Sequence, residues 1–238
     1  MNLLDAFIVL TLVAAMGSAL VVVLTGRRLG APGARFLALV FAGTAIWCAS
    51  YAMELLSATL EAKVFWAKVA YIGIVLVPPS WVLFVESYLG EYRRRLAPLF
   101  YAIPLATLVF VALAPGVPWV WSETSLVKNG GVTTLAVEYG PWFWVHTAYS
   151  YLCLGVGSAL LVVGIFRRAR GLSAQGLLIA AAALLPWFVN ALVVFDVVEI
   201  DNLDPTPPAM AVSMLLIVLG LLRLQVLEVF PSMVSIAH

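Results

Sequence analysis

Four polar side chains interrupt the apolar runs of this sequence and are the first candidates for chemistry. They are Glu54, Lys68, His146 and Asn190, and each lies within about 10 Å of the same boundary of the apolar region at 1.5 Å of rise per residue. Ionisable groups inside membrane helices are costly to bury, so those that occur there usually serve a function. Aromatic residues share this layer: Trp47, Tyr51, Trp66, Tyr71, Trp142, Trp144, Tyr149 and Trp187.

Polar groups among aromatic rings are typical of a small-molecule pocket. The residues expected to line it are Trp47, Tyr51, Glu54, Lys68, Tyr71, His146, Tyr149, Trp187 and Asn190. The same residues also have a plainer interpretation, because Trp and Tyr gather at membrane interfaces without binding anything. Glu54 and Lys68 could be an ion pair between two helices, and His146 could face lipid headgroups.

A second polar pair lies near the other boundary. Glu86 and Arg223 could pair across the bundle as a signalling latch that changes with conformational state. Alternatively, each side chain extends separately to the interface.

Catalytic and cofactor-binding patterns do not occur in this sequence. There is no HExxH, Walker or nucleophile-elbow motif, so we expect no enzymatic activity, metal or cofactor in this chain. Cys48 and Cys153 both lie inside apolar runs and are interpreted as packing residues rather than a disulfide.

The elements that must position these residues are membrane helices. Of 238 residues, 64% are hydrophobic and only 11% are charged, with a mean hydropathy of +1.08. A soluble domain cannot hide that much apolar surface. The net charge of +1 gives no argument for a nucleic-acid partner. Seven segments are long and apolar enough to span a bilayer: about 5–25, 33–56, 64–89, 96–114, 141–166, 173–195 and 207–227.

Orientation is predicted from the positions of the basic residues. Arginines concentrate in the first, third and fifth loops and the adjoining helix ends: Arg27, Arg28, Arg35, Arg93, Arg94, Arg95, Arg167, Arg168 and Arg170. Lys/Arg-rich loops are cytoplasmic. We therefore expect an all-α seven-helix bundle in the plasma (inner) membrane, with its N-terminus outside and its C-terminus in the cytoplasm.

The long loop between helices four and five, residues 115–140, has a pattern of its own. Two β-prone stretches flank Asn129-Gly130-Gly131, which is a favourable hairpin turn. We expect a short β-hairpin over the outer mouth of the bundle; a disordered loop is the alternative. Helix three contains Pro78-Pro79, which we expect to split it.

Several segments together resemble a known family. They include Trp47-x3-Tyr51-x2-Glu54, EAKVFWAKVAYIGIVLVPPSWVLFVESYLG (61–90), GPWFWVHTAYSYL (140–152), LLPWFVNAL (184–192), LDPTPPAM (203–210) and LLRLQVLEVFPSMVSIAH (221–238). This ordered set is similar to the N-terminal seven-transmembrane sensor module of bacterial and archaeal histidine kinases. Asp204-Pro205-Thr206-Pro207 matches the family's D-x-T-P before helix seven. Arg223 and Pro231 match its R-x-x-L-x-x-x-x-P exit.

The resemblance implies a sensory input domain. It would detect a small ligand or a membrane signal and transmit it through helix seven to a kinase or cyclase module beyond residues 228–238, which we interpret as the start of a cytoplasmic linker. The expected partners are an unidentified small molecule, membrane lipid and a second copy of the protein in a homodimer. Two alternatives are a small-molecule transporter or channel and an intramembrane enzyme. The inner half of the bundle offers few polar groups for a transport path, and no ligand set for a cofactor is apparent.

Overall fold

The computed structural model describes residues 3–27, 29–129, 132–168, 174–198 and 203–223. Within these residues the chain forms seven α-helices. They are α1 (Leu3–Gly26), α2 (Ala34–Leu56), α3 (Leu60–Leu89), α4 (Ala102–Leu113), α5 (Pro141–Arg168), α6 (Ala174–Val194) and α7 (Thr206–Arg223). A 3₁₀ helix, η1 (Ala97–Tyr101), precedes α4, and two strands, β1 (Trp121–Asn129) and β2 (Val132–Tyr139), lie between α4 and α5.

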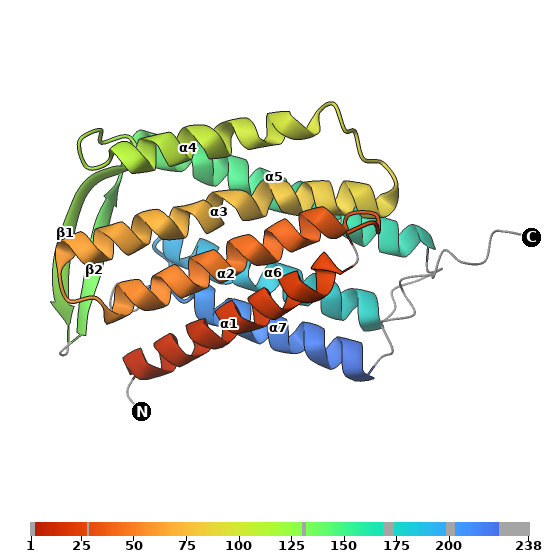
Figure 1. Cartoon of the computed structure of the whole chain (residues 1–238), viewed down its shortest axis with the longest axis horizontal. Helices are drawn as coiled ribbons and strands as arrows, with labels where there is room; N and C mark the ends of the chain where they lie inside the picture. Colours follow the sequence, from red (N-terminus) through yellow and green to blue (C-terminus); the bar gives the residue numbers. More distant parts are fainter. Residues whose placement is uncertain (1–2, 28, 130–131, 169–173, 199–202, 224–238) are drawn as a thin grey trace, which may run out of the picture.

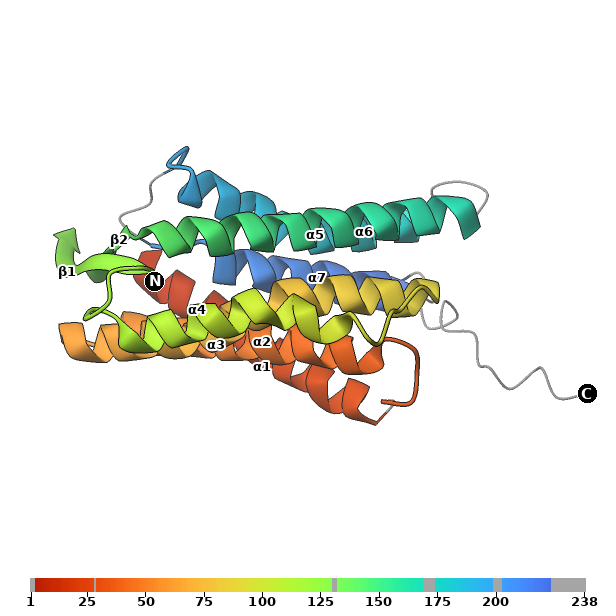
Figure 2. The same cartoon turned by 90° about the horizontal axis from the view of Figure 1, so that it is seen from above.

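The helices lie side by side in a bundle whose long axis is horizontal in Figure 1. The two strands cover one end, which we call the strand end, and the N-terminus lies at that end (Figure 1). Helix α3 packs against both α2 and α5, while α7 packs against α6 and α1. Figure 2 shows α7 between the pair α5 and α6 on one side and helices α1 to α4 on the other.

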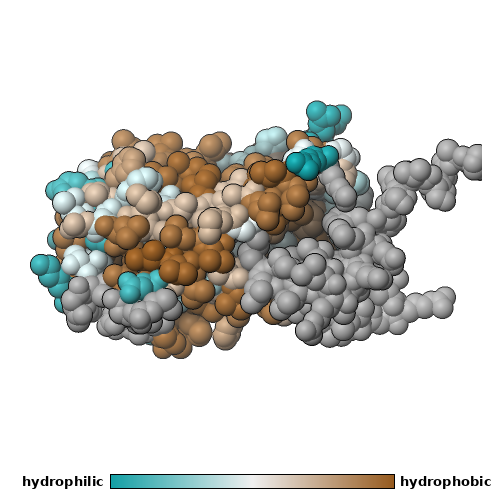
Figure 3. Space-filling view, turned by 60° about the horizontal axis from the view of Figure 1, so that its bottom comes forward, coloured by the Kyte–Doolittle hydropathy of each residue, from teal (hydrophilic) through white to brown (hydrophobic). Residues whose placement is uncertain are grey.

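Four helices of the described residues are long and apolar enough to cross a membrane. They are Leu4–Gly26, Ala34–Leu56, Leu60–Leu89 and Pro141–Gly164, and shorter apolar helices occur at Ala97–Leu113 and Ala181–Val194. Large apolar side chains point outward, including Met16 at 66% exposure and Leu152 at 67%. Figure 3 shows such residues covering the middle of one face. A surface of this kind is stable in lipid rather than water, so this is a membrane protein.

Helices α2 and α3 approach each other closely at two glycines. A Cβ atom on Gly43 would lie 2.9 Å from the carbonyl oxygen of Gly73, and a Cβ on Gly73 would collide with the carbonyl oxygen of Gly43. Small residues let membrane helices pack backbone to backbone. This crossing brings Trp47 and Tyr51 of α2 against α3.

Helix α3 is one continuous helix of 30 residues. The expectation that Pro78-Pro79 splits it was wrong. Both prolines are fully buried among neighbouring helices, and such packing tolerates the lost backbone hydrogen bonds. The helix also begins at Leu60, earlier than the expected 64, because Thr59 caps it by accepting a hydrogen bond from the N–H of Ala62 at 3.3 Å.

The strands β1 and β2 pair antiparallel, from Asn129 opposite Val132 to Trp121 opposite Tyr139. The residues between them lie outside the described part. The bundle end of β1 is buried, since Trp121 is 2% exposed and packs in one cluster with Tyr71 and Val111. The strand pair is therefore anchored on α3 and α4.

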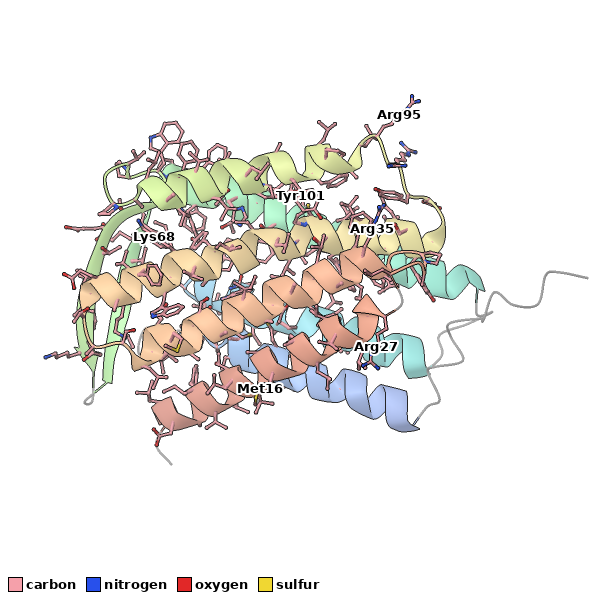
Figure 4. All side chains as sticks on the ribbon, viewed as in Figure 1. Met16, Arg27, Arg35, Lys68, Arg95 and Tyr101 are labelled. Atoms are coloured by element: carbon pink, nitrogen blue, oxygen red, sulfur yellow. The ribbon has the colours of Figure 1, made fainter. Side chains whose placement is uncertain are left out.

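The end opposite the strands carries arginines. Figure 4 shows Arg27, Arg35 and Arg95 there, whereas Lys68 lies near the strands. The Arg35 guanidinium lies over the rings of Phe36 and Tyr92, with its central carbon 4.6 and 5.0 Å from the ring centroids. We call this end the arginine end.

Candidate functional site

A cavity of about 700 Å³ lies in the half of the bundle nearest the strands. Its wall is formed by α2, α3, α5 and α6, by both strands, by residues just after α6, and by Leu203 and Asp204 just before α7. The volume lies within the range of small-molecule sites. The strand β2 contributes Leu135, Val137 and Tyr139.

Most of the residues that the sequence analysis selected lie on this wall. They are Trp47, Tyr51, Glu54, Tyr71, His146, Trp187 and Asn190. Lys68 and Tyr149 lie elsewhere. The Lys68 ammonium donates to the carbonyl oxygens of Ala112 at 3.2 Å and Ala114 at 2.5 Å, at the end of α4. The Tyr149 hydroxyl donates to the carbonyl oxygen of Phe100.

The lysine near Glu54 is Lys63, not Lys68. Lys63 is fully buried in the first turns of α3, and its ammonium donates to the backbone carbonyl oxygen of Glu54 at 2.8 Å. The Lys63 charge also interacts with the Glu54 carboxyl group. An ion pair of Glu54 with Lys68, the plainer interpretation, is therefore replaced by a contact of Glu54 with Lys63.

Asn190 connects three helices. Its side-chain oxygen accepts a hydrogen bond from the Tyr151 hydroxyl of α5 at 2.7 Å. Its side-chain nitrogen donates to the Thr206 hydroxyl at 3.1 Å. Thr206 is the first residue of α7 and is fully buried. The cavity wall is thus hydrogen-bonded directly to the start of α7.

Asp204 makes a second connection to α7. Its carboxylate accepts a hydrogen bond from the backbone N–H of Thr206 at 2.9 Å, which caps the helix. The backbone N–H of Asp204 donates to the Tyr51 hydroxyl at 2.6 Å. One turn further into α7, the Cys48 thiol of α2 lies 3.8 Å from the Met210 sulfur. These contacts join α2 to α7.

His146 is buried, at 4% exposure, and is bonded through both ring nitrogens. Its Nδ1 lies 3.3 Å from the Thr107 hydroxyl and its Nε2 lies 3.3 Å from the Ser150 hydroxyl. Thr107 donates to the carbonyl oxygen of Ile103 at 2.8 Å and accepts from the Trp142 indole at 2.9 Å. Its hydroxyl proton is therefore used, so Nδ1–H must donate to it. A neutral ring then accepts from Ser150 at Nε2.

Aromatic rings cover much of the remaining wall. Trp47 and Trp187 face each other across α2 and α6 with centroids 6.4 Å apart. Tyr71 meets Trp121 edge-to-face at 5.4 Å. The wall therefore combines flat apolar surfaces with a few polar groups.

Several lining residues were not selected from the sequence, among them Tyr151, Trp121 and Asp204. Tyr151 follows Thr147 by four residues, so both lie on the face of α5 that lines the cavity. Asp204 belongs to the D-x-T-P motif, which was noted as a family feature rather than as part of a pocket. Trp121 reaches the wall through the packing of β1 on the bundle; the sequence predicted strands over this end but not which of their residues contact the helices.

The polar groups and aromatic rings of this wall are suited to binding a small molecule. No group of three His, Cys, Asp or Glu in the described residues could hold a metal ion. Cys48 and Cys153 are buried free thiols. At the arginine end, Glu86 is half-buried and interacts with the charge of Arg93. The side chain of Arg223 lies outside the described part, as does the expected linker at 228–238.

The comparisons with known proteins agree with this architecture. A search of curated proteins finds no match to the chain. The sequence profile of one family, described as the N-terminal 7TM region of histidine kinase, matches residues 8–231. Regions of this kind are membrane sensor domains in histidine kinase signalling. Because the match covers nearly all of the sequence, this chain belongs to the family of N-terminal seven-transmembrane regions of histidine kinases.

Proposed function

We propose that this chain binds a small ligand in the cavity at the strand end and transmits the binding event through α7 to a cytoplasmic output module. The observation that carries the proposal is the hydrogen-bonded path from the cavity wall to α7. Asn190 of the wall bonds Thr206, and Tyr51 of the wall bonds Asp204, which caps the same helix. Few other contacts would connect a bound molecule so directly to a helix end.

The path suggests how a signal would travel. A ligand shifts a conformational equilibrium only by binding one state better than another. A ligand that displaced Asn190 or Tyr51 would change the hydrogen bonds at the start of α7, and α7 would then rotate or slide as a rigid element. In a homodimer, such a movement would alter how the two copies of the output module are arranged.

The proposed orientation places the strand end outside the cytoplasm and the arginine end inside, in a multi-pass plasma membrane protein. Arg27, Arg35 and Arg95 at one end support this orientation, because basic residues favour the cytoplasmic side. The membrane lipid would contact the exposed apolar side chains of α1, α4 and α5.

Orientation can be tested by cysteine labelling in intact cells. Lys128→Cys on β1 and Arg95→Cys near η1 replace exposed residues at opposite ends. A membrane-impermeant maleimide should label the first variant only. The native thiols of Cys48 and Cys153 are buried and give a low background. Labelling of Arg95→Cys alone would reverse the proposed topology.

Signal transfer can be tested by fusing the chain to a histidine kinase output module and measuring autophosphorylation. Thr206→Val and Asn190→Leu each break the path to α7 and should change the basal activity or its response to ligand. Ser122→Ala is the matched control, because Ser122 is an exposed strand residue that bonds only the carbonyl oxygen of Glu138. Kinase activity that is the same in all three variants would refute transmission through α7.

A further inference from the structure

The charged groups on the cavity wall all have the same sign. Glu54, Asp196 and Asp204 line the cavity, and no lysine or arginine of the described residues does. Both ring nitrogens of His146 are occupied by hydroxyl groups, those of Thr107 and Ser150. A molecule inside the cavity would therefore face three carboxyl groups and no permanent positive charge.

The carboxyl oxygens of Glu54 are available to accept a hydrogen bond from a ligand. Glu54 is only 9% exposed, yet its carboxyl oxygens form no hydrogen bond with any residue in the described part of the chain. Lys63 interacts with its charge but directs its hydrogen bond to the Glu54 backbone. The carboxyl oxygens of Glu54 are not among the fully buried, unpartnered atoms of the described residues, so a molecule in the cavity can reach them. Glu54 is therefore placed to receive a donor from a ligand.

The aromatic rings around these acids are suited to a positively charged ligand. Ten aromatic side chains of the described residues line the cavity in addition to the acids, and they include Trp47, Tyr51, Tyr71, Trp121, Trp144 and Trp187. The faces of Trp and Tyr rings attract organic cations, and aromatic cages with acidic groups recognise quaternary ammonium compounds. An anion would be repelled by the acids, and a neutral apolar molecule would donate no hydrogen bond to the carboxyl oxygens of Glu54. A metal ion is disfavoured because it needs several oxygen ligands close together, which the described residues do not offer.

We infer that the cavity binds an organic cation, an amine or quaternary ammonium group, with its charge beside Glu54 and Asp204 and its carbon groups against Trp47 and Trp187. The inference rests on the proposed function only in assigning this cavity as the sensory site. The cation could be a free amine or the amine of a lipid headgroup, since both present the same chemistry.

The test compares three probes of similar shape and different charge. Choline is the cation, 3,3-dimethylbutan-1-ol is its neutral analogue, and 3,3-dimethylbutanoate is an anion of similar size. Binding to the purified chain in dodecyl maltoside, a detergent without an amine, is followed by calorimetry and by tryptophan fluorescence. We expect choline to bind in the millimolar range or tighter and the other two probes to bind about tenfold more weakly or not at all.

The variants assign the binding to this cavity. Glu54→Gln should weaken choline binding about 10- to 100-fold, as loss of a charged partner does. Glu61→Gln is the matched control, because Glu61 is an exposed acid in the first turn of α3 and does not line the cavity. Trp187→Leu should also weaken binding, whereas Trp187→Phe should retain part of it. Thermal unfolding of each variant identifies any that fails to fold, in which case Asp204→Asn replaces Glu54→Gln.

Two outcomes overturn the inference: equal binding of all three probes, and choline binding that Glu54→Gln and Asp204→Asn leave unchanged. Choline binding that is weaker in nanodiscs of phosphatidylethanolamine than in phosphatidylglycerol supports a headgroup amine. Equal choline binding in both supports a free amine. A fused kinase that responds to a neutral or anionic molecule would refute the inference but leave the proposed function intact. Choline binding without any change in the activity of the fused kinase would support the inference but refute the proposed function.

Discussion

The backbone N–H of Asp204 donates a hydrogen bond of 2.6 Å to the hydroxyl of Tyr51, across 153 positions of the sequence. Through its carboxylate, Asp204 also caps Thr206 at the start of α7. Asp204 therefore connects the cavity wall on α2 with the start of α7. A substitution of Tyr51 on α2 should therefore alter the start of α7.

Tyr51→Phe tests this connection, because it removes the hydroxyl and keeps the ring. The free energy of unfolding should fall by about 1 kcal/mol, since the N–H of Asp204 loses its partner. Tyr92→Phe is the control: the Tyr92 hydroxyl forms no hydrogen bond in the described residues, and its ring contacts with Phe36 and Arg35 would remain. Unfolding in mixed micelles measures both. Equal losses in the two variants would mean that the Tyr51 bond contributes nothing specific.

The carboxyl group of Asp204 should make the stability of the folded protein depend on pH. Burial raises the pKa of the Asp204 carboxyl above its ordinary value, although hydrogen bonds with Thr206 oppose this. A raised pKa means that the folded protein binds the proton more tightly than the unfolded chain does. The resulting stabilisation is fully present below about pH 3.9 and is lost as the pH rises through the raised pKa. In Asp204→Asn, which keeps an oxygen to cap Thr206, this part of the slope of stability against pH should disappear. An unchanged slope would exclude Asp204 as its source.

The membrane helices were predictable because their signal is local: each is a long apolar run. The same holds for the polar layer near one boundary, where most of the expected lining residues lie. Which lysine approaches Glu54 was not predictable, because it depends on where α3 begins. Lys63 and Lys68 are five residues apart and thus about 140° apart around the helix, so only one of them can face α2.

Tyr149 shows the same limitation. It is two residues from both Thr147 and Tyr151, which line the cavity, so it points about 160° away from them. Its hydroxyl bonds Phe100 in η1 instead, a direction that the sequence did not predict. Depth follows from counting residues along one helix, whereas direction depends on how the helices pack. The contribution of Trp121 required knowledge of how the strands fold over the bundle end.

Lys68→Met separates a structural role from a binding role. The Lys68 ammonium binds two carbonyl oxygens at the C-terminal end of α4, a favourable place for a cation. Its loss should lower the free energy of unfolding by about 1 kcal/mol and leave choline binding unchanged. Lys128→Met, at an exposed position of β1, should change neither quantity. Weaker choline binding in Lys68→Met would indicate that Lys68 takes part in ligand binding.

A substitution at the contact between Gly43 and Gly73 should cause the largest loss of stability among these variants. In Gly73→Ala the new methyl group would meet the carbonyl oxygen of Gly43 and lie 2.8 Å from the backbone nitrogen of Trp47. Because both are backbone atoms, the helices must move apart, at a cost of about 2 kcal/mol or more. Gly155→Ala on α5 is the matched control, since a Cβ there meets nothing within 4 Å.

Alanine is the better helix former by about 1 kcal/mol, so Gly155→Ala should be neutral or stabilising. The opposite signs of the two variants make the comparison independent of propensity, and unfolding in mixed micelles measures it. The displacement of α2 in Gly73→Ala should also move Trp47 in the cavity wall and weaken choline binding, which Gly155→Ala leaves intact. If Gly73→Ala were as stable as Gly155→Ala, α2 and α3 could not cross as closely as the structure has them.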